Sequence, residues 1–234
     1  MASKSEVTFG ARLNNAQTLQ THLQSFKDYT SSNPALLPAA LQTFIDDIRN
    51  QNESVAGETQ AYSNAVNKRQ LLFKKDSKSL EKIMSPIGSE IRSVFGKDSK
   101  EAAYITGIVN KIRGEKISRT KKEPDAEFVS QSERSFGSMT QNFSDMITTL
   151  TKYGNSYSPA NKAIQVPSLA AFRDALEQAN NAVTTAFGKL KIATDKRAAS
   201  YDTLTNTCQR VKDAVKSQYL VNSSEYALVK GLRI

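Results

Sequence analysis

Few side chains of this 234-residue chain carry nucleophilic or metal-binding chemistry. The chain has one histidine, His22, and one cysteine, Cys208, so one molecule cannot build a zinc site from imidazole and thiolate ligands. The Glu-x-x-His pair of di-iron bundles is missing, and the ten glycines are scattered singly, so no glycine-rich phosphate loop is formed. We therefore expect a protein that is not an enzyme and that needs no metal or cofactor. In this interpretation His22 is a surface residue and Cys208 a small core residue.

Two carboxylates are the best remaining candidates for chemistry. Asp46 and Asp174 occupy matching places in two similar halves of the chain. A carboxylate-only metal site or an acid–base pair would require both on a shared buried face. The alternative, an acid on the solvent face of a helix, is the commoner situation and is the one we favour.

The charge of the chain is strongly basic, with a formal net charge of +9. Two Lys-Arg pairs lie at matching places, and a segment between the halves carries a further run of cations. These residues could contact phosphates or an acidic partner. The alternative is a solvated helix surface and a solvated linker. The candidate contact residues are Lys68, Arg69, Lys196, Arg197, Lys116, Arg119, Lys121 and Lys122.

The chain repeats itself once. Ser5-Glu6-x-x-Phe9-Gly10 returns in the second half as Ser132-Glu133-x-x-Phe136-Gly137, and Lys68-Arg69 returns as Lys196-Arg197. The offset between the copies shortens near the end of each half, where Ser99-x-Glu101 matches Ser223-x-Glu225. Over the three matching blocks 20 of 70 positions are identical, whereas unrelated sequences of ordinary composition match at about 6 to 7%. The pattern predicts an internal duplication.

Each half has the same predicted order of helices. Apolar residues three and four positions apart predict an opening helix, and a proline-containing loop follows it. A long apolar seam with a period near 3.5 predicts a long helix, although a hairpin turn at Lys68-Arg69 and at Asp195–Arg197 remains open. Lys97-Asp98-Ser99 and Asn222-Ser223-Ser224 are expected to form the N-cap turns of a short closing helix. Pro86 and Gly88 predict a kink where the first half has its four additional residues.

These patterns predict an all-α fold without a confident strand. We expect an elongated helical bundle from an internal duplication, with each unit built as short helix, long helix, short helix and the units related by a pseudo-twofold. The predicted organisation is a first helical repeat at 1–111, a basic connector at 112–127 and a second helical repeat at 128–234.

The first residues lack the apolar stretch of a signal peptide, and no run reaches the length of a membrane span. We expect a cytoplasmic protein without a membrane partner. A single cysteine also excludes an internal disulfide.

The closing segment, Asn222 to Ile234, and the helix around Ser132-Glu-Arg-Ser-Phe-Gly-Ser-Met-Thr-Gln resemble a group of uncharacterised bacterial helical proteins. This resemblance implies a bacterial origin and an all-helical fold, and it implies no activity. From the residues themselves we expect a non-enzymatic structural or protein-interaction scaffold that self-assembles through its helical seams. The alternative is a basic polyanion-binding protein for DNA or RNA.

Overall fold

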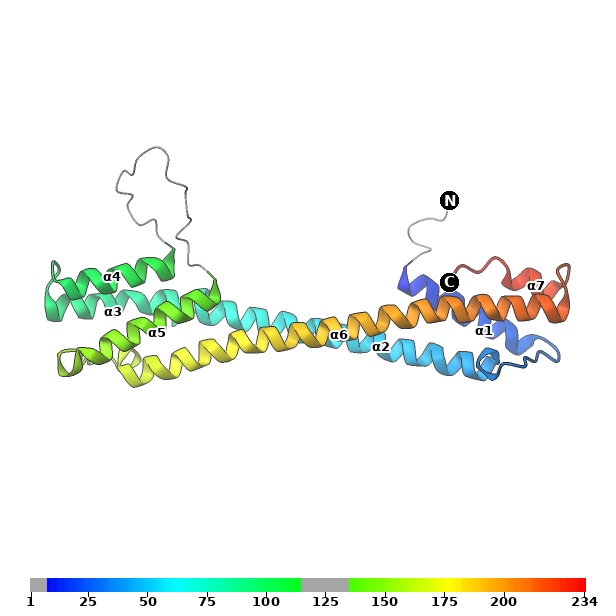
Figure 1. Ribbon diagram of the computed structural model, residues 1–234, viewed down its shortest axis with the longest axis horizontal. Coiled ribbons are helices and arrows are strands. Elements are labelled where there is room, and N and C mark those ends of the chain that lie inside the picture. The colour runs from blue at the N-terminus through cyan, green and yellow to red at the C-terminus, as the bar shows by residue number, and fades with distance from the viewer. Residues whose placement is uncertain (1–7, 115–134) are drawn as a thin grey trace, which may run out of the picture. The chain divides into compact units, whose positions relative to one another are not determined.

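The computed structural model describes residues 8–114 and 135–234. Over these ranges the structure is 83% helical and has no strand, which confirms the all-α class. Short 3₁₀ turns at Pro34–Leu36, Gly154–Ser156 and Lys162–Ile164 join some of the helices. The helices shown in Figure 1 are α1 (Phe9–Ser25), α2 (Pro38–Gln70), α3 (Leu80–Phe95), α4 (Lys100–Arg113), α5 (Phe136–Lys152), α6 (Val166–Tyr219) and α7 (Ser224–Val229).

The chain forms two compact units. Unit 1 comprises residues 1–60 and 188–234, and unit 2 comprises residues 61–187. The helices α2 and α6 each begin in one unit and end in the other. Each sequence repeat therefore contributes residues to both compact units, and the boundaries of the units differ from those of the repeats. Most of the predicted basic connector lies outside the described residues.

Hydroxyl side chains mark where the helices begin. Thr8 and Ser135 accept a hydrogen bond from the backbone N–H three residues later and thereby cap α1 and α5. The caps are thus the residues directly before Phe9 and Phe136, and Ser5 and Ser132 lie outside the described residues. Ser99 and Ser223 cap α4 and α7 in the same way, as predicted. Each cap satisfies one of the backbone donors that a helix start leaves without a partner.

The core of unit 1 joins the two ends of the sequence. The apolar face of α1 and the first turns of α2 pack against the second half of α6 and against α7. Apolar residues spaced by three and four positions supply one buried stripe per helix. The buried residues are Ala16, Leu19, Leu23, Leu36, Leu41, Ile45, Ile48, Tyr201, Leu204, Cys208, Val211, Val215 and Val229.

The core of unit 2 lies among α3, α4, α5 and the first turns of α6. Helix α4 packs against both α3 and α5. Its buried residues include Phe73, Leu80, Met84, Ile87, Ile91, Ala102, Ile105, Ile112, Met139, Phe143, Met146, Leu150, Leu169 and Leu176.

The proline loops of the two units are held by the same pair of contacts. In unit 1 the Tyr29 hydroxyl donates to the Leu36 carbonyl at 3.2 Å, and in unit 2 the Tyr157 hydroxyl donates to the Ile164 carbonyl at 2.7 Å. Asn33 accepts a backbone hydrogen bond at the start of one 3₁₀ turn, and its counterpart Asn161 does so at the start of the other. The tyrosines satisfy carbonyls that helix formation leaves free.

The long seam of the second half is one unbroken helix of 54 residues, α6, which confirms a long helix in place of a hairpin. The first half is different. Helix α2 ends at Gln70, a π-helical turn spans Leu71–Lys75, and α3 starts at Leu80. The break therefore lies after Phe73. Helix α3 continues through Pro86, so the four additional residues do not lie there as predicted.

The position of this break accounts for the four additional residues. Phe73 and Tyr201 correspond in the register that pairs Lys68 with Lys196, and both are fully buried. Leu80 and Leu204 are also both fully buried, and they correspond in the shorter register that pairs Ser99 with Ser223. From Leu80 onward, the buried positions of α3 keep the spacing of those in α6. The additional residues therefore lie between Phe73 and Leu80, in the π-helical turn and the loop that follows it.

Candidate interaction surfaces

In each of the two predicted Lys-Arg pairs, the arginine packs within its unit and the lysine is exposed. The Arg69 guanidinium lies over the Phe136 ring in unit 2, with 4.2 Å from its central carbon to the ring centroid. In unit 1 the Arg197 guanidinium lies over the Phe9 ring at 4.8 Å. Both arginines are half-buried, whereas Lys68 and Lys196 are exposed. A guanidinium over an aromatic face is attracted by the ring quadrupole, so each arginine stabilises its own unit.

Each of these phenylalanines also packs on a buried aromatic ring. Phe136 meets Phe73 with centroids 4.9 Å apart, and Phe9 meets Tyr201 at 4.4 Å. The same stack of arginine, phenylalanine and buried ring thus recurs in both units. Sequence reasoning noted that the phenylalanines and arginines recur but did not connect them, because the partners in each stack are far apart along the chain.

A basic surface surrounds the π-helical turn of unit 2. Between residues 68 and 78 there are five cations and one acid, Asp76. Three of the lysines, Lys68, Lys75 and Lys78, are exposed, while the Lys74 ammonium lies 5.6 Å from the Phe136 centroid. Sequence reasoning missed the last three lysines of this group; the run Lys74-Lys-Asp-Ser-Lys78 was the available signal. The connector residues Lys116, Arg119, Lys121 and Lys122 lie outside the described residues.

The two candidate carboxylates lie on open surface. Asp46 pairs with Arg49 at 2.6 Å, and its side chain is 51% exposed. Asp174 pairs with Arg173 at 2.7 Å, and its side chain is 54% exposed. A hydrated carboxylate beside a guanidinium is a weak surface ion pair. Neither residue has the buried setting that a shared acid–base or metal site would require.

The single cysteine and the single histidine both contribute to packing in unit 1. Cys208 is fully buried in the core, as predicted, and burial raises the pKa of its thiol to about 12. Its neighbour Lys212 is also buried and donates to the Leu232 carbonyl, which holds the closing segment against the unit. Burial lowers the pKa of this lysine. His22 is half-buried, with its ring stacked 6.5 Å from that of Phe26.

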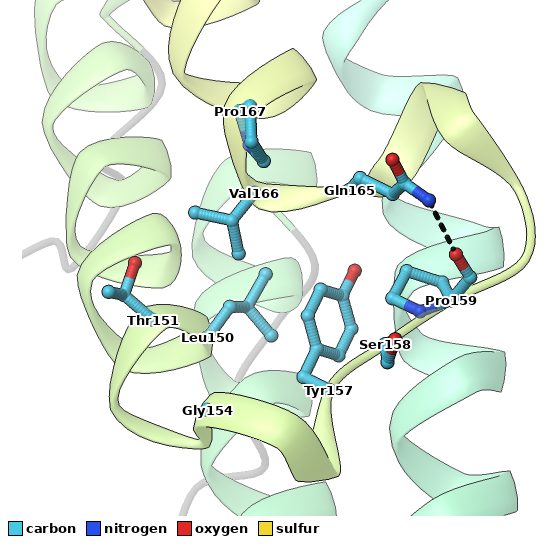
Figure 2. Close-up of a pocket in the computed structure, with 9 residues that line it drawn as sticks. All are labelled: Leu150, Thr151, Gly154, Tyr157, Ser158, Pro159, Gln165, Val166 and Pro167. Atoms are coloured by element: carbon cyan, nitrogen blue, oxygen red, sulfur yellow. Dashed lines mark hydrogen bonds between the residues drawn. The ribbon is translucent and has the colours of Figure 1, made fainter.

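An open pocket of about 430 Å³ lies at the end of unit 2 where α5 joins the proline loop (Figure 2). Its lining is mixed, with apolar groups of Leu150, Val166 and the two prolines Pro159 and Pro167 beside polar groups of Thr151, Tyr157, Ser158 and Gln165. Its polar groups are mostly engaged. The Gln165 amide donates to the Pro159 carbonyl at 3.0 Å, as Figure 2 shows, and the Tyr157 hydroxyl donates to a loop carbonyl. Such a lining offers a ligand few directed hydrogen bonds.

Unit 1 exposes large apolar side chains in the turn between α6 and α7 and on α7. Leu220 is 71% exposed, Val221 is 56% exposed, and Leu228 on α7 is 51% exposed. Leu220 also has a φ of 73°, in the left-handed region. The corresponding turn of unit 2 has a glycine, Gly96, at positive φ. Leucine is sterically strained in this region and glycine is not.

Among the described residues no group of three or more His, Cys, Asp or Glu side chains is placed to hold a metal ion. In the same part of the chain, no helix has the length and hydropathy to cross a membrane. Comparison with known proteins found no matching family model, no similar curated protein and no similar solved structure.

Proposed function

We propose that this protein is a non-enzymatic helical scaffold that associates with a second copy of itself through the turn between α6 and α7. The observation that carries the proposal is Leu220. It combines left-handed backbone strain with a side chain that is 71% exposed. A strained leucine costs about 1 to 2 kcal/mol relative to an unstrained backbone. The backbone N–H of Leu220 donates to the Lys216 carbonyl and its carbonyl accepts from Ser223, so the strain helps to end α6. The exposed leucine side chain gains little burial from it within the chain.

Residues kept in strained conformations are concentrated at functional sites. Leu220 and Val221 are two consecutive exposed apolar residues, and Leu228 on α7 is exposed as well. Association removes such a surface from water, and this burial is the main favourable contribution in most protein–protein contacts.

The groups around the turn suit a second copy as the occupant. Asp28 and Glu225 both raise the pKa of Tyr219, after the larger effect of burial, so two acids lie near this tyrosine. Lys216 lies one helical turn before Leu220 and is exposed. A surface with an apolar centre and a rim of both signs is self-complementary under a twofold, because the acids of one copy can face the lysine of the other.

The test compares Leu220→Asn with the unchanged chain by analytical ultracentrifugation over a range of concentrations. Asparagine tolerates the left-handed region and is polar. We expect weaker self-association together with an unchanged or higher free energy of unfolding. The matched control is Ile192→Gln on α6, because Ile192 is also 71% exposed but belongs to a regular helix. A chain that is monomeric at all concentrations, or equal weakening by both variants, would refute the proposal.

We further propose that the two halves arose by duplication and are related by a pseudo-twofold. The recurring stacks of arginine on phenylalanine support this, as do the serine caps Ser99 and Ser223 and the tyrosine contacts of the proline loops. A chemically synthesised or expressed half, residues 1–111, would test it by forming a dimer that reproduces the circular dichroism of the whole chain. A bacterial origin and a cytoplasmic location remain part of this proposal.

A second candidate function is polyanion binding. The net charge of +9 and the exposed lysines of unit 2 favour it. Neutralising Lys116, Arg119, Lys121 and Lys122 together tests whether the connector takes part. An affinity for nucleic acid that is unchanged in this variant would exclude the connector.

A further inference from the structure

The lysine turn, which we define as residues 68–78, presents cations on a locally ordered surface. Lys68, Lys75 and Lys78 are exposed. The only acid of the turn, Asp76, accepts the backbone N–H of Lys78 at 2.8 Å. The Ser79 hydroxyl donates to the Lys74 carbonyl at 3.1 Å, and Ser79 is buried. These hydrogen bonds hold the backbone between Lys74 and Ser79, which carries Lys75 and Lys78, and this reduces the entropy lost when it binds a partner.

The core does not require the residues added between Phe73 and Leu80. Phe73 before them and Phe95 after them contact aromatic rings of α5 and its C-terminal end, at 4.9 Å and 5.0 Å. In unit 1 the corresponding residues of α6, Tyr201 and Tyr219, contact rings in and at the end of α1 at 4.4 Å and 5.7 Å without any break in the helix. The additional residues thus leave the packing on either side unchanged.

What the additional residues contribute is a surface of different chemistry. In α6 the two residues between Tyr201 and Leu204 are Asp202 and Thr203, so that position has an acid and no lysine. In the first half the corresponding stretch holds Lys74, Lys75 and Lys78, next to a π-helical turn. This π-helical turn ends α2, because the backbone is extended at Asp76. The packing on either side gives no reason for the insertion, so its effect lies in the surface that it presents.

We propose that the lysine turn binds the phosphates of double-stranded nucleic acid; this inference rests on the second candidate function above and gives it a location. Exposed ammonium groups are point charges that suit phosphates. The nearest ring, Phe136, is already contacted by Arg69, Phe73 and Lys74, so no aromatic face is left there on which a base can stack. Single-strand binding relies on such stacking, whereas duplex binding through the backbone does not.

The test measures the affinity of the full chain for a mixed-sequence DNA duplex of about 30 base pairs by fluorescence anisotropy, at several salt concentrations. Each phosphate contact contributes about 0.9 to the slope of log affinity against log salt. Lys68→Gln/Lys75→Gln/Lys78→Gln should therefore lower the slope by about 3 and weaken binding on the order of 100-fold near physiological salt. Glutamine is a good helix former, so the fold should persist.

The matched control is Lys189→Gln/Lys191→Gln/Lys196→Gln. These three lysines are also exposed, they lie on α6, and their removal changes the net charge equally. In addition, Lys196 is the counterpart of Lys68 in the second half. We expect this control to keep most of the affinity. Arginine at positions 68, 75 and 78 should restore binding, which separates loss of charge from misfolding.

The possible failures differ in what they refute. An unmodified chain that binds neither the duplex nor single-stranded DNA would refute both polyanion binding and its location. Equal loss in the two triple variants would leave polyanion binding standing but would refute the lysine turn as its site. Tighter binding to single-stranded DNA, to poly-glutamate or to phosphatidylserine vesicles than to the duplex would refute the assignment to double-stranded nucleic acid.

Discussion

Deleting Lys75–Lys78 should join α2 and α3 into one continuous helix without disturbing the core of unit 2. The buried residues around the turn are separated by 7, 4, 3 and 4 sequence positions; they are Phe73, Leu80, Met84, Ile87 and Ile91. After the deletion the first separation becomes 3 positions. The series then equals that of the buried residues Tyr201, Leu204, Cys208, Val211 and Val215 along the unbroken α6.

The expected magnitude follows from the helix geometry. With the spacing matched, the four buried side chains of α3 keep their places, so the free energy of unfolding should change by no more than about 2 kcal/mol. Deleting one residue more, Lys75–Ser79, turns α3 by about 100° relative to α2. The four side chains then leave the core, at about 1.5 to 3 kcal/mol each. The total, about 6 to 12 kcal/mol, is as large as the stability of a typical domain.

Far-UV circular dichroism and urea unfolding measure the stability of both variants, and hydrogen exchange reports protection of the α3 amides. The four-residue deletion should keep that protection, and the five-residue deletion should lose it. Two results would refute the reasoning: loss of α3 protection in the four-residue variant, or equal stability of the two variants. The second result would show that the turn has no role in setting the register of α3.

Three further predictions concern single side chains. Burial raises the pKa of Tyr157, with a smaller contribution from Glu90, so the stability that the neutral tyrosine contributes is present below the ordinary tyrosine pKa of 10.0 and is lost as the pH rises further. Tyr157→Phe should lower the free energy of unfolding by about 1 kcal/mol at pH 7, because the Ile164 carbonyl loses its donor. Urea unfolding at several pH values should also show that the free energy of unfolding of this variant falls less steeply above pH 10. Arg69→Lys keeps the charge but loses the stack on Phe136, so it should cost about 1 kcal/mol in thermal unfolding, with no cost in a Phe136→Leu background. Burial raises the pKa of Cys208 to about 12, so a thiol reagent at pH 8 should label it about a thousand times more slowly than a free thiol from the pKa alone. Rapid labelling of the folded chain would contradict the burial of Cys208.

The signals that predicted the fold correctly were local. Apolar residues three and four positions apart located the opening helices, and the long apolar seam with a period near 3.5 indicated the continuous α6. The cap turns that contain Ser99 and Ser223 could be predicted because a cap depends only on its own helix. Pro86 gave a wrong position for the four additional residues, because proline indicates where a helix bends most easily and not where residues have been inserted. The additional residues lie before Leu80, more than one helical turn earlier in the chain.

The sequence by itself determined the helical class, the near absence of metal-binding and nucleophilic side chains, and the recurrence of Arg69 and Phe136 as Arg197 and Phe9. Only the tertiary structure decided that residues 1–60 share a compact unit with residues 188–234, and that both arginines stack on phenylalanines. The physical reason is that periodicity shows which face of a helix is apolar but not which distant helix covers it. The same limit applies to charge, because a run of lysines in the sequence does not reveal which of them the packing leaves exposed.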